Sequence, residues 1–186
     1  MKKIVITGGP STGKTSVINN LENKGYTCLH EVIRDMTSKE QENDQGITFK
    51  SNPIVSVDDP MAFNQSILDA RVTQYQLAET KEDAILFLDR GIPDVLAYMD
   101  CFEQQYPQSF IDACTNHSYD YVFLMPPWKE IHVSDSQRFE SFEEALLIDK
   151  CLSNTYAQFG YKVIIVPKDT IQKRVEFILN TIKEII

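Results

Sequence analysis

One short segment near the amino terminus limits what this chain can fold into more than any other. Residues 8–15 read Gly-Gly-Pro-Ser-Thr-Gly-Lys-Thr, directly after the apolar residues 4–6 and directly before a segment with helical spacing. Glycine carries no Cβ, so this backbone can turn sharply and bring its N–H groups together. The positive end of the next helix points to the same place. A strand, a glycine-rich turn and a helix in this order predict a loop that binds phosphate.

The spacing of the motif also assigns chemistry to its last residues. In a Gly-x-x-x-x-Gly-Lys-Thr loop the lysine, here Lys14, reaches the β- and γ-phosphates of a nucleotide, and the hydroxyl of Thr15 binds Mg²⁺. A chance glycine-rich turn is the alternative, but it would not need both flanking elements. The residues expected to bind the nucleotide are Gly8, Gly9, Pro10, Ser11, Thr12, Gly13, Lys14, Thr15 and Ser16.

Composition narrows the class of ligand. With 186 residues, of which 42% are hydrophobic, the chain is expected to form a single domain over residues 1–186. Its 18 basic and 27 acidic residues give a net charge of −9, so a broad surface for nucleic acid is not expected. A small phosphate compound is the ligand that this charge favours.

The cysteines and the amino terminus indicate a reducing, aqueous compartment. None of the four cysteines forms a C-x-x-C pair, and the three scattered histidines add no metal-binding pattern. The leading apolar run stops at Gly8, too early for a signal peptide or a membrane span. We therefore expect free thiols, a cytoplasmic location and no membrane partner.

Five apolar runs predict the strands of a parallel sheet. Each is continuously apolar rather than alternating, as expected of buried strands that helices cover on both faces, and helical patterns lie between them. This order predicts an α/β fold, and the spacing of Ser141 and Glu144 is typical of a capping box at a helix start. The expected strands are residues 3–7, 26–30, 84–88, 121–125 and 162–166, and the expected helices are residues 14–22, 60–80, 141–159 and 170 onwards.

Polar residues at the carboxyl ends of the strands are the candidates for chemistry, because ligands of open α/β sheets lie beyond these ends. Asp89 ends the apolar run at residues 85–88, the arrangement that puts a carboxylate beside Mg²⁺ and its waters. An ordinary aspartate at a helix start is the alternative. Arg90 is expected to bind a phosphate or another substrate anion, with Asp94 beyond it on the substrate side.

Glu31 and Arg34 follow the second expected strand and are three residues apart, so they would share one face of a helix. We expect both to face the crevice. There Glu31 would accept a proton from a substrate hydroxyl or hold a sugar, and Arg34 would bind a phosphate. An ion pair within the helix is the alternative.

Two irregular segments are long for a compact domain, and such loops are usually functional or mobile. Residues 43–58 are compatible with an acceptor-binding loop or a switch, and residues 126–140 with a lid. Within this lid Arg138, three residues after Asp135, would close over the β- and γ-phosphates and exclude water. A surface ion pair is the alternative for these two residues. Trp128 would cover a base or serve only in packing.

These motifs, taken in order, resemble those of the small P-loop ATPase and kinase proteins grouped under an AAA label. This group is related to the nicotinamide riboside kinase domain and, more remotely, to deoxynucleoside and thymidylate kinases. The resemblance extends along the chain. It is carried by residues 6–15, 31–34, 88–94, 126–128, 135–138 and 160–167.

The resemblance implies a three-layer P-loop NTPase fold, with a five-stranded parallel sheet in the order 2-3-1-4-5 and helices on both faces. It also implies that the base of ATP lies near residues 167–170 and that an acceptor faces Glu31 and Arg34. Asp89 and Arg90 would then serve the metal ion and the acceptor.

We therefore expect a kinase that uses ATP with Mg²⁺ and transfers the γ-phosphoryl group to a small nucleoside- or nucleotide-like acceptor. Its catalytic residues would be Lys14, Glu31, Asp89 and Arg138. A motor ATPase would need a glutamate directly after Asp89, where this chain has Arg90. An ATPase or a regulatory protein that senses nucleotide without an acceptor stays the alternative. The sequence does not indicate the oligomeric state.

Overall fold

The computed structural model describes residues 1–32, 59–131 and 141–185. Its centre is a parallel five-stranded sheet in the order β2-β3-β1-β4-β5, which confirms the topology that the motifs imply. The strands are β1 (Lys2–Thr7), β2 (Thr27–Leu29), β3 (Ile85–Asp89), β4 (Tyr121–Leu124) and β5 (Val163–Ile165). The described helices of more than one turn are α1 (Lys14–Asn23), α4 (Pro60–Glu79), α5 (Pro93–Cys101), α6 (Gln108–Asn116), α7 (Phe142–Gln158) and α8 (Ile171–Ile185).

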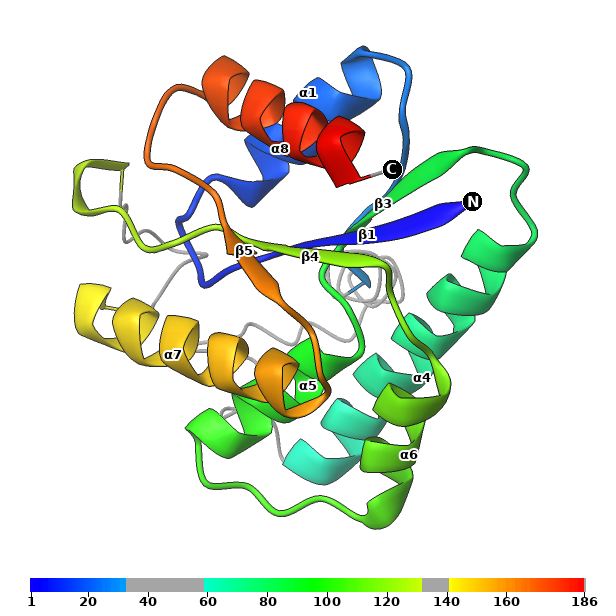
Figure 1. Ribbon diagram of the computed structural model, residues 1–186. Helices are drawn as coiled ribbons and strands as arrows, with labels where there is room; N and C mark the ends of the chain where they lie inside the picture. Colours follow the sequence, from blue (N-terminus) through cyan, green and yellow to red (C-terminus); the bar gives the residue numbers. More distant parts are fainter. Residues whose placement is uncertain (33–58, 132–140, 186) are drawn as a thin grey trace, which may run out of the picture.

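Helices cover both faces of the sheet, which confirms the expected three-layer α/β architecture (Figure 1). Helices α1 and α8 lie on one face, and α4, α5, α6 and α7 lie on the other. Each face has its own core, because successive strand residues point to opposite sides. Ile4 and Ile6 of β1 pack in the core with α1 and α8, whereas Val5 between them packs in the core with α4–α7.

The expectation that all five strands are buried is wrong for the two strands at the edges of the sheet. All three residues of β2 are only half-buried, and Ile165 of β5 is 52% exposed. An edge strand has one neighbouring strand instead of two, so its residues are less covered. Both β2 and β5 are also shorter than the apolar runs that contain them. A continuous apolar run therefore marks a parallel strand without revealing its position in the sheet.

The four helices that the sequence predicts at residues 14–22, 60–80, 141–159 and from 170 onwards are confirmed, and the described part of the chain contains two further α-helices, α5 and α6. At the start of α7, the Ser141 hydroxyl accepts the Glu144 N–H at 3.1 Å, and the Glu144 carboxylate accepts the Ser141 N–H at 2.7 Å. This is the expected capping box. The sequence patterns do not predict α5 and α6, which have nine residues each. Residues 93–99 of α5 are all buried, so this helix has no amphipathic stripe to recognise.

The register of the sheet brings the phosphate loop and Asp89 to one edge. β1 and β3 pair in parallel with Ile6 opposite Asp89, and β1 pairs with β4 on its other side. The glycine-rich residues 8–13 leave β1 at this carboxyl end and lead into α1. The expected loop at residues 43–58 and residues 132–140 of the expected lid lie outside the described residues.

The four cysteines are free, as expected. Within the part of the chain that the structure describes, none of the helices combines the length and the apolar character that crossing a bilayer requires.

Replacing Ile178 with alanine should strongly destabilise the protein. Its side chain is fully buried in the core that α8 shares with α1, and truncating a buried isoleucine costs about 2–5 kcal/mol of unfolding free energy. Ile171→Ala is the matched control, because the same side chain at the start of the same helix is 42% exposed. Urea unfolding followed by circular dichroism measures both losses, and equal losses would contradict the packing of α8.

Candidate functional site

The phosphate loop contains glycines at positions where a side chain would not fit. Gly8 has a φ of 152°, and a Cβ there would lie 2.5 Å from the carbonyl oxygen of Met125. Gly13 has a φ of 83°, and a Cβ there would lie 2.8 Å from Nη1 of Arg174. Both positions combine an unusual backbone conformation with a close neighbour, so the path of the loop requires these two glycines.

Lys14 folds back over the loop. Its Nζ donates to the carbonyl oxygens of Gly8 and Gly9, both at 2.8 Å, and the Thr12 hydroxyl donates to the same Gly9 oxygen at 2.9 Å. Burial and repulsion from Arg90 lower the pKa of Lys14 to about 7. An anion bound in the loop would stabilise the charged form of Lys14, so the lysine is suited to a phosphate ligand.

Asp89 is buried at the end of β3, with 3% of its surface exposed. Its Oδ1 has no hydrogen-bond partner in the described part of the chain, and burial raises the pKa of its carboxyl. An unpaired buried carboxylate oxygen fits a Mg²⁺ site, because Mg²⁺ is usually held by one or two carboxylates together with substrate phosphates. Thr15, in the first turn of α1, is the other expected ligand.

In the described part of the chain, histidines, cysteines and carboxylates do not gather into a closed metal cage. Among residues 1–32, 59–131 and 141–185, no group of three or more such side chains is arranged to hold a metal ion.

Glu31 follows β2 and lies between two arginines. Its Oε1 accepts a hydrogen bond from Nη2 of Arg71 at 2.7 Å, and its Oε2 pairs with Nε of Arg90 at 2.5 Å. Burial opposes the ionisation of Glu31, but the two guanidinium groups outweigh it and lower the pKa of this carboxyl. Glu31 is therefore an ionised acceptor at neutral pH.

Arg90 adopts the left-handed conformation, with a φ of 75°, directly after β3. Its guanidinium contacts Glu31, Asp94 Oδ1 at 3.1 Å and the Tyr98 hydroxyl at 3.2 Å, and its side chain is 12% exposed. The sequence suggests an arginine available to a substrate anion. The structure shows a guanidinium that already has protein partners, so its contact with substrate stays a prediction.

Asp94 joins three elements of the site near the start of α5. Its Oδ1 accepts the Thr7 hydroxyl at 2.6 Å, and its Oδ2 accepts the Tyr156 hydroxyl at 2.6 Å and the Gly91 N–H at 2.9 Å. Only 2% of its surface is exposed. These contacts suit a carboxylate that organises the site, whereas its expected contact with substrate stays a prediction.

Arg71 is a candidate that the sequence patterns miss. It lies on α4 with 2% of its surface exposed, donates to Glu31, and reaches the carbonyl oxygen of Asp89 at 3.5 Å. In the sequence it stands between the apolar Leu68 and Val72 of a helix. The signal in the sequence was a charged residue inside an apolar stripe. Because arginine is almost never fully buried unless it is paired, this position indicates a buried partner for Arg71.

The other expected site residues fall into two groups. In the described part, Pro10 and Ser11 are half-buried in the loop, and Ser16 is exposed in the first turn of α1. The expected site residues outside the described part are Arg34, Asp135 and Arg138, and their roles stay predictions.

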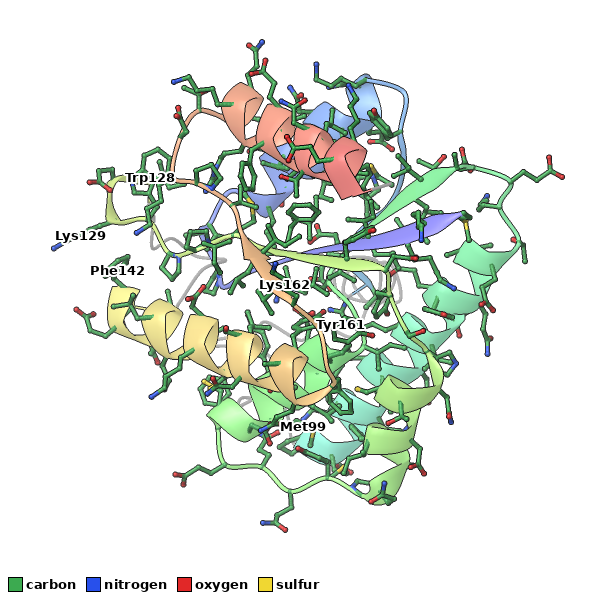
Figure 2. The ribbon with its side chains drawn as sticks, in the orientation of Figure 1. Met99, Trp128, Lys129, Phe142, Tyr161 and Lys162 are labelled. Atoms are coloured by element: carbon green, nitrogen blue, oxygen red, sulfur yellow. The ribbon has the colours of Figure 1, made fainter. Side chains whose placement is uncertain are left out.

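A cavity of about 1060 Å³ lies at the other end of the sheet, where its lining includes Tyr119, Tyr161 and Lys162. Figure 2 shows Trp128 near the loop that leads into α8, and Tyr161 and Lys162 at the amino-terminal end of β5. Among the described residues, none of those expected to do chemistry lines this cavity, so it is separate from the described part of the candidate site.

Comparison with known families finds one match, to a family described as AAA domain, over residues 3–174. A comparison with curated protein sequences finds no match.

Several solved structures are similar to this chain. A deoxyadenosine kinase from M. mycoides with bound products has a TM-score of 0.70 at 18% identity, covering 98% of this chain and 99% of that chain. NadR protein in complex with NR has a TM-score of 0.73 at 19% identity, covering 98% of this chain and 51% of that chain. Thymidylate kinase from Candida albicans has a TM-score of 0.67 at 15% identity, covering 98% and 91%. At these identities the likeness establishes a P-loop kinase-like fold.

Replacing Tyr156 with phenylalanine should destabilise the protein. The change removes the O–H that is donated to the buried Asp94 carboxylate, and hydrogen bonds to charged groups contribute about 1.5–3 kcal/mol. Tyr106→Phe is the matched control, because its hydroxyl donates to the exposed Asp100 carboxylate at 2.9 Å and should contribute much less. Urea unfolding near neutral pH measures both losses.

The loss in the Tyr156 variant should also depend on pH. Burial opposes the ionisation of Asp94, but Arg90 and Arg71 outweigh it and lower the pKa of this carboxyl. Its stabilising contribution is thus complete above the pKa of an unfolded aspartate, about 3.9, and is lost as the pH falls through the lower folded value. A loss from Tyr156→Phe no larger than that from Tyr106→Phe near neutral pH would contradict the role of Asp94.

Proposed function

We propose that this chain, which belongs to the AAA domain family, is a kinase that transfers the γ-phosphoryl group of Mg-ATP to a small nucleoside- or nucleotide-like acceptor. The observation that carries the proposal is the ionised Glu31, held between two arginines at the same edge of the sheet as the phosphate loop. The likeness in fold to a deoxyadenosine kinase and a thymidylate kinase supports the same class of reaction.

The nucleotide side of the site would be formed by the phosphate loop and the end of β3. Lys14 would exchange its contacts with the Gly8 and Gly9 carbonyl oxygens for contacts with the β- and γ-phosphates. Asp89 and Thr15 would hold Mg²⁺, whose charge would offset that of the phosphates during transfer. Residues 8–13 and the first turn of α1 would supply the N–H groups around the phosphates.

The acceptor side would be formed by Glu31 and the arginines around it. The lowered pKa of Glu31 makes it a weak base that stays ionised, so its carboxylate would accept a hydrogen bond from an acceptor hydroxyl and orient it rather than remove its proton early. Phosphoryl transfer depends mainly on positioning and charge stabilisation, so an orienting carboxylate is sufficient. Arg71 and Arg90 would keep Glu31 ionised and fixed in direction.

A turnover assay separates the kinase from the alternatives. The purified chain is incubated with ATP, Mg²⁺ and a panel of nucleosides, nucleotides and vitamins, and ADP release is measured. Release that depends on one acceptor supports the kinase. Release without any acceptor indicates an ATPase, and ATP binding without release indicates a protein that senses nucleotide.

Lys14→Ala should remove most of the affinity for ATP, because the variant loses the cation that contacts the phosphates. Titration calorimetry should find an affinity at least about tenfold weaker than in the native chain, the loss expected for a charged hydrogen bond. Lys24→Ala is the matched control, since Lys24 is exposed just after α1. Unchanged ATP affinity in the Lys14 variant would contradict the assignment of the loop.

Glu31→Gln should leave ATP binding intact and lower acceptor turnover by about two orders of magnitude, the loss expected when the acceptor hydroxyl is no longer held in position. The amide keeps the size of the side chain but loses the charge that holds the two arginines. Glu22→Gln is the control, because Glu22 is exposed and pairs only weakly with His30 on the surface. Parallel loss of ATP affinity and turnover in the Glu31 variant would rule out a role confined to the acceptor.

A further inference from the structure

Arg174 contacts the phosphate loop at Thr12, 162 positions away in the sequence. It is in the first turn of α8 with only 1% of its surface exposed. Its Nη1 donates to the carbonyl oxygen of Thr12 at 3.0 Å, and its Nε donates to the carbonyl oxygen of Pro167 at 3.3 Å. One guanidinium therefore connects the loop with the segment between β5 and α8.

Trp128 covers the same guanidinium. The Cζ of Arg174 lies 5.5 Å from the centre of the Trp128 ring, within the range of a cation–π contact. Trp128 belongs to the segment that follows β4, and Figure 2 shows it close to the turn that leads into α8. Nη2 of Arg174 is buried and has no hydrogen-bond partner in the described part of the chain. The guanidinium of Arg174 is thus buried under Trp128, although its Nη2 donates no hydrogen bond within the described part of the chain.

The contact with Thr12 acts on the peptide that joins Thr12 to Gly13. In a trans peptide the carbonyl and the N–H point in opposite directions, so a donor that holds the Thr12 carbonyl also directs the Gly13 N–H. Gly13 has the left-handed φ of 83°, and its α-carbon faces Nη1 of Arg174 so closely that a Cβ would lie 2.8 Å away. The orientation of this peptide therefore depends on Arg174.

We propose that Arg174 is a positioning residue of the nucleotide site. It holds the Thr12–Gly13 peptide so that the Gly13 N–H points toward the bound phosphates. Because the same guanidinium contacts Trp128, it also transmits the binding of phosphate in the loop to Trp128. This inference rests on the proposed function, because it assumes that the loop binds a nucleotide. It adds to that function a residue from the last helix, which lies outside every motif of the phosphate site.

Calorimetry with ADP on the native chain and three variants tests the proposal. Arg174→Met removes the guanidinium, and Arg174→Lys keeps the positive charge but replaces the planar, forked guanidinium with a single ammonium nitrogen. Lys173→Met is the matched control, because it removes a positive charge from the adjacent residue, whose side chain is 65% exposed. We expect both Arg174 variants to bind ADP about tenfold or more weakly than the native chain, and Lys173→Met to bind as the native chain does.

The outcomes separate this inference from the proposed function. A native chain that does not bind ADP overturns the proposed function and the inference with it. A native chain that binds, with folded Arg174 variants that bind equally well, overturns the inference alone. Equally weak ADP binding by Lys173→Met also overturns the inference, because the effect would then come from the loss of any nearby positive charge. If Arg174→Met does not fold, Arg174→Lys decides in the same way, with folding checked by circular dichroism.

Fluorescence tests the link to Trp128, which is the single tryptophan of the chain. Tripolyphosphate has no base, so a change that it causes in the emission of Trp128 cannot come from a base stacked on the ring. We expect tripolyphosphate to change the emission of the native chain and to leave that of Arg174→Lys unchanged. An unchanged native emission, at a tripolyphosphate concentration that calorimetry shows to be saturating, overturns the link.

Discussion

The Asp94 carboxylate is the group on which the arrangement of the site depends. It receives hydroxyls from Thr7 at the end of β1 and Tyr156 of α7, and it pairs with Arg90 after β3. Because these contacts join two strands and two helices, they hold the carboxyl ends of the central strands against the helices that cover them. The Gly91 N–H completes this set, and a Cβ at Gly91 would lie 2.6 Å from the Tyr156 hydroxyl, so the turn has no room for a larger residue.

The buried charged groups around Asp94 form two sets, which differ in the direction of their pKa shifts. Glu31 and Arg90 form an ion pair. Against the effect of burial, Arg71 and Arg90 lower the pKa of the Glu31 carboxyl, and Tyr98 and Glu31 raise the pKa of the Arg90 guanidinium. Lys14 and Asp89 show the opposite shifts, since burial lowers the pKa of the lysine and raises that of the aspartate. Groups that burial pushes toward their neutral forms are those that a charged ligand would stabilise most. This contrast supports a polyanion and a cation at the loop.

The sequence patterns predict the phosphate loop, the sheet and most of the long helices, because each of these has a local signature. They fail for α5, which is buried almost all round, and for the edge strands, whose apolar runs resemble those of central strands. They also fail for Arg71, because its role depends on a glutamate forty positions earlier in the chain. The two arginines on either side of Glu31 come from different elements, which no spacing rule relates.

The sequence by itself determined the glycine-rich loop that we expect to bind phosphate, the strands and the residues at their carboxyl ends. These features follow from properties of neighbouring residues, such as the missing Cβ of glycine and the period of apolar side chains. Only the tertiary structure decided which charges meet, because Arg71 and Arg174 reach the site through the packing of α4 and α8 on opposite faces of the sheet. Contacts between distant elements depend on that packing, and the residues next to either arginine in the sequence do not predict it.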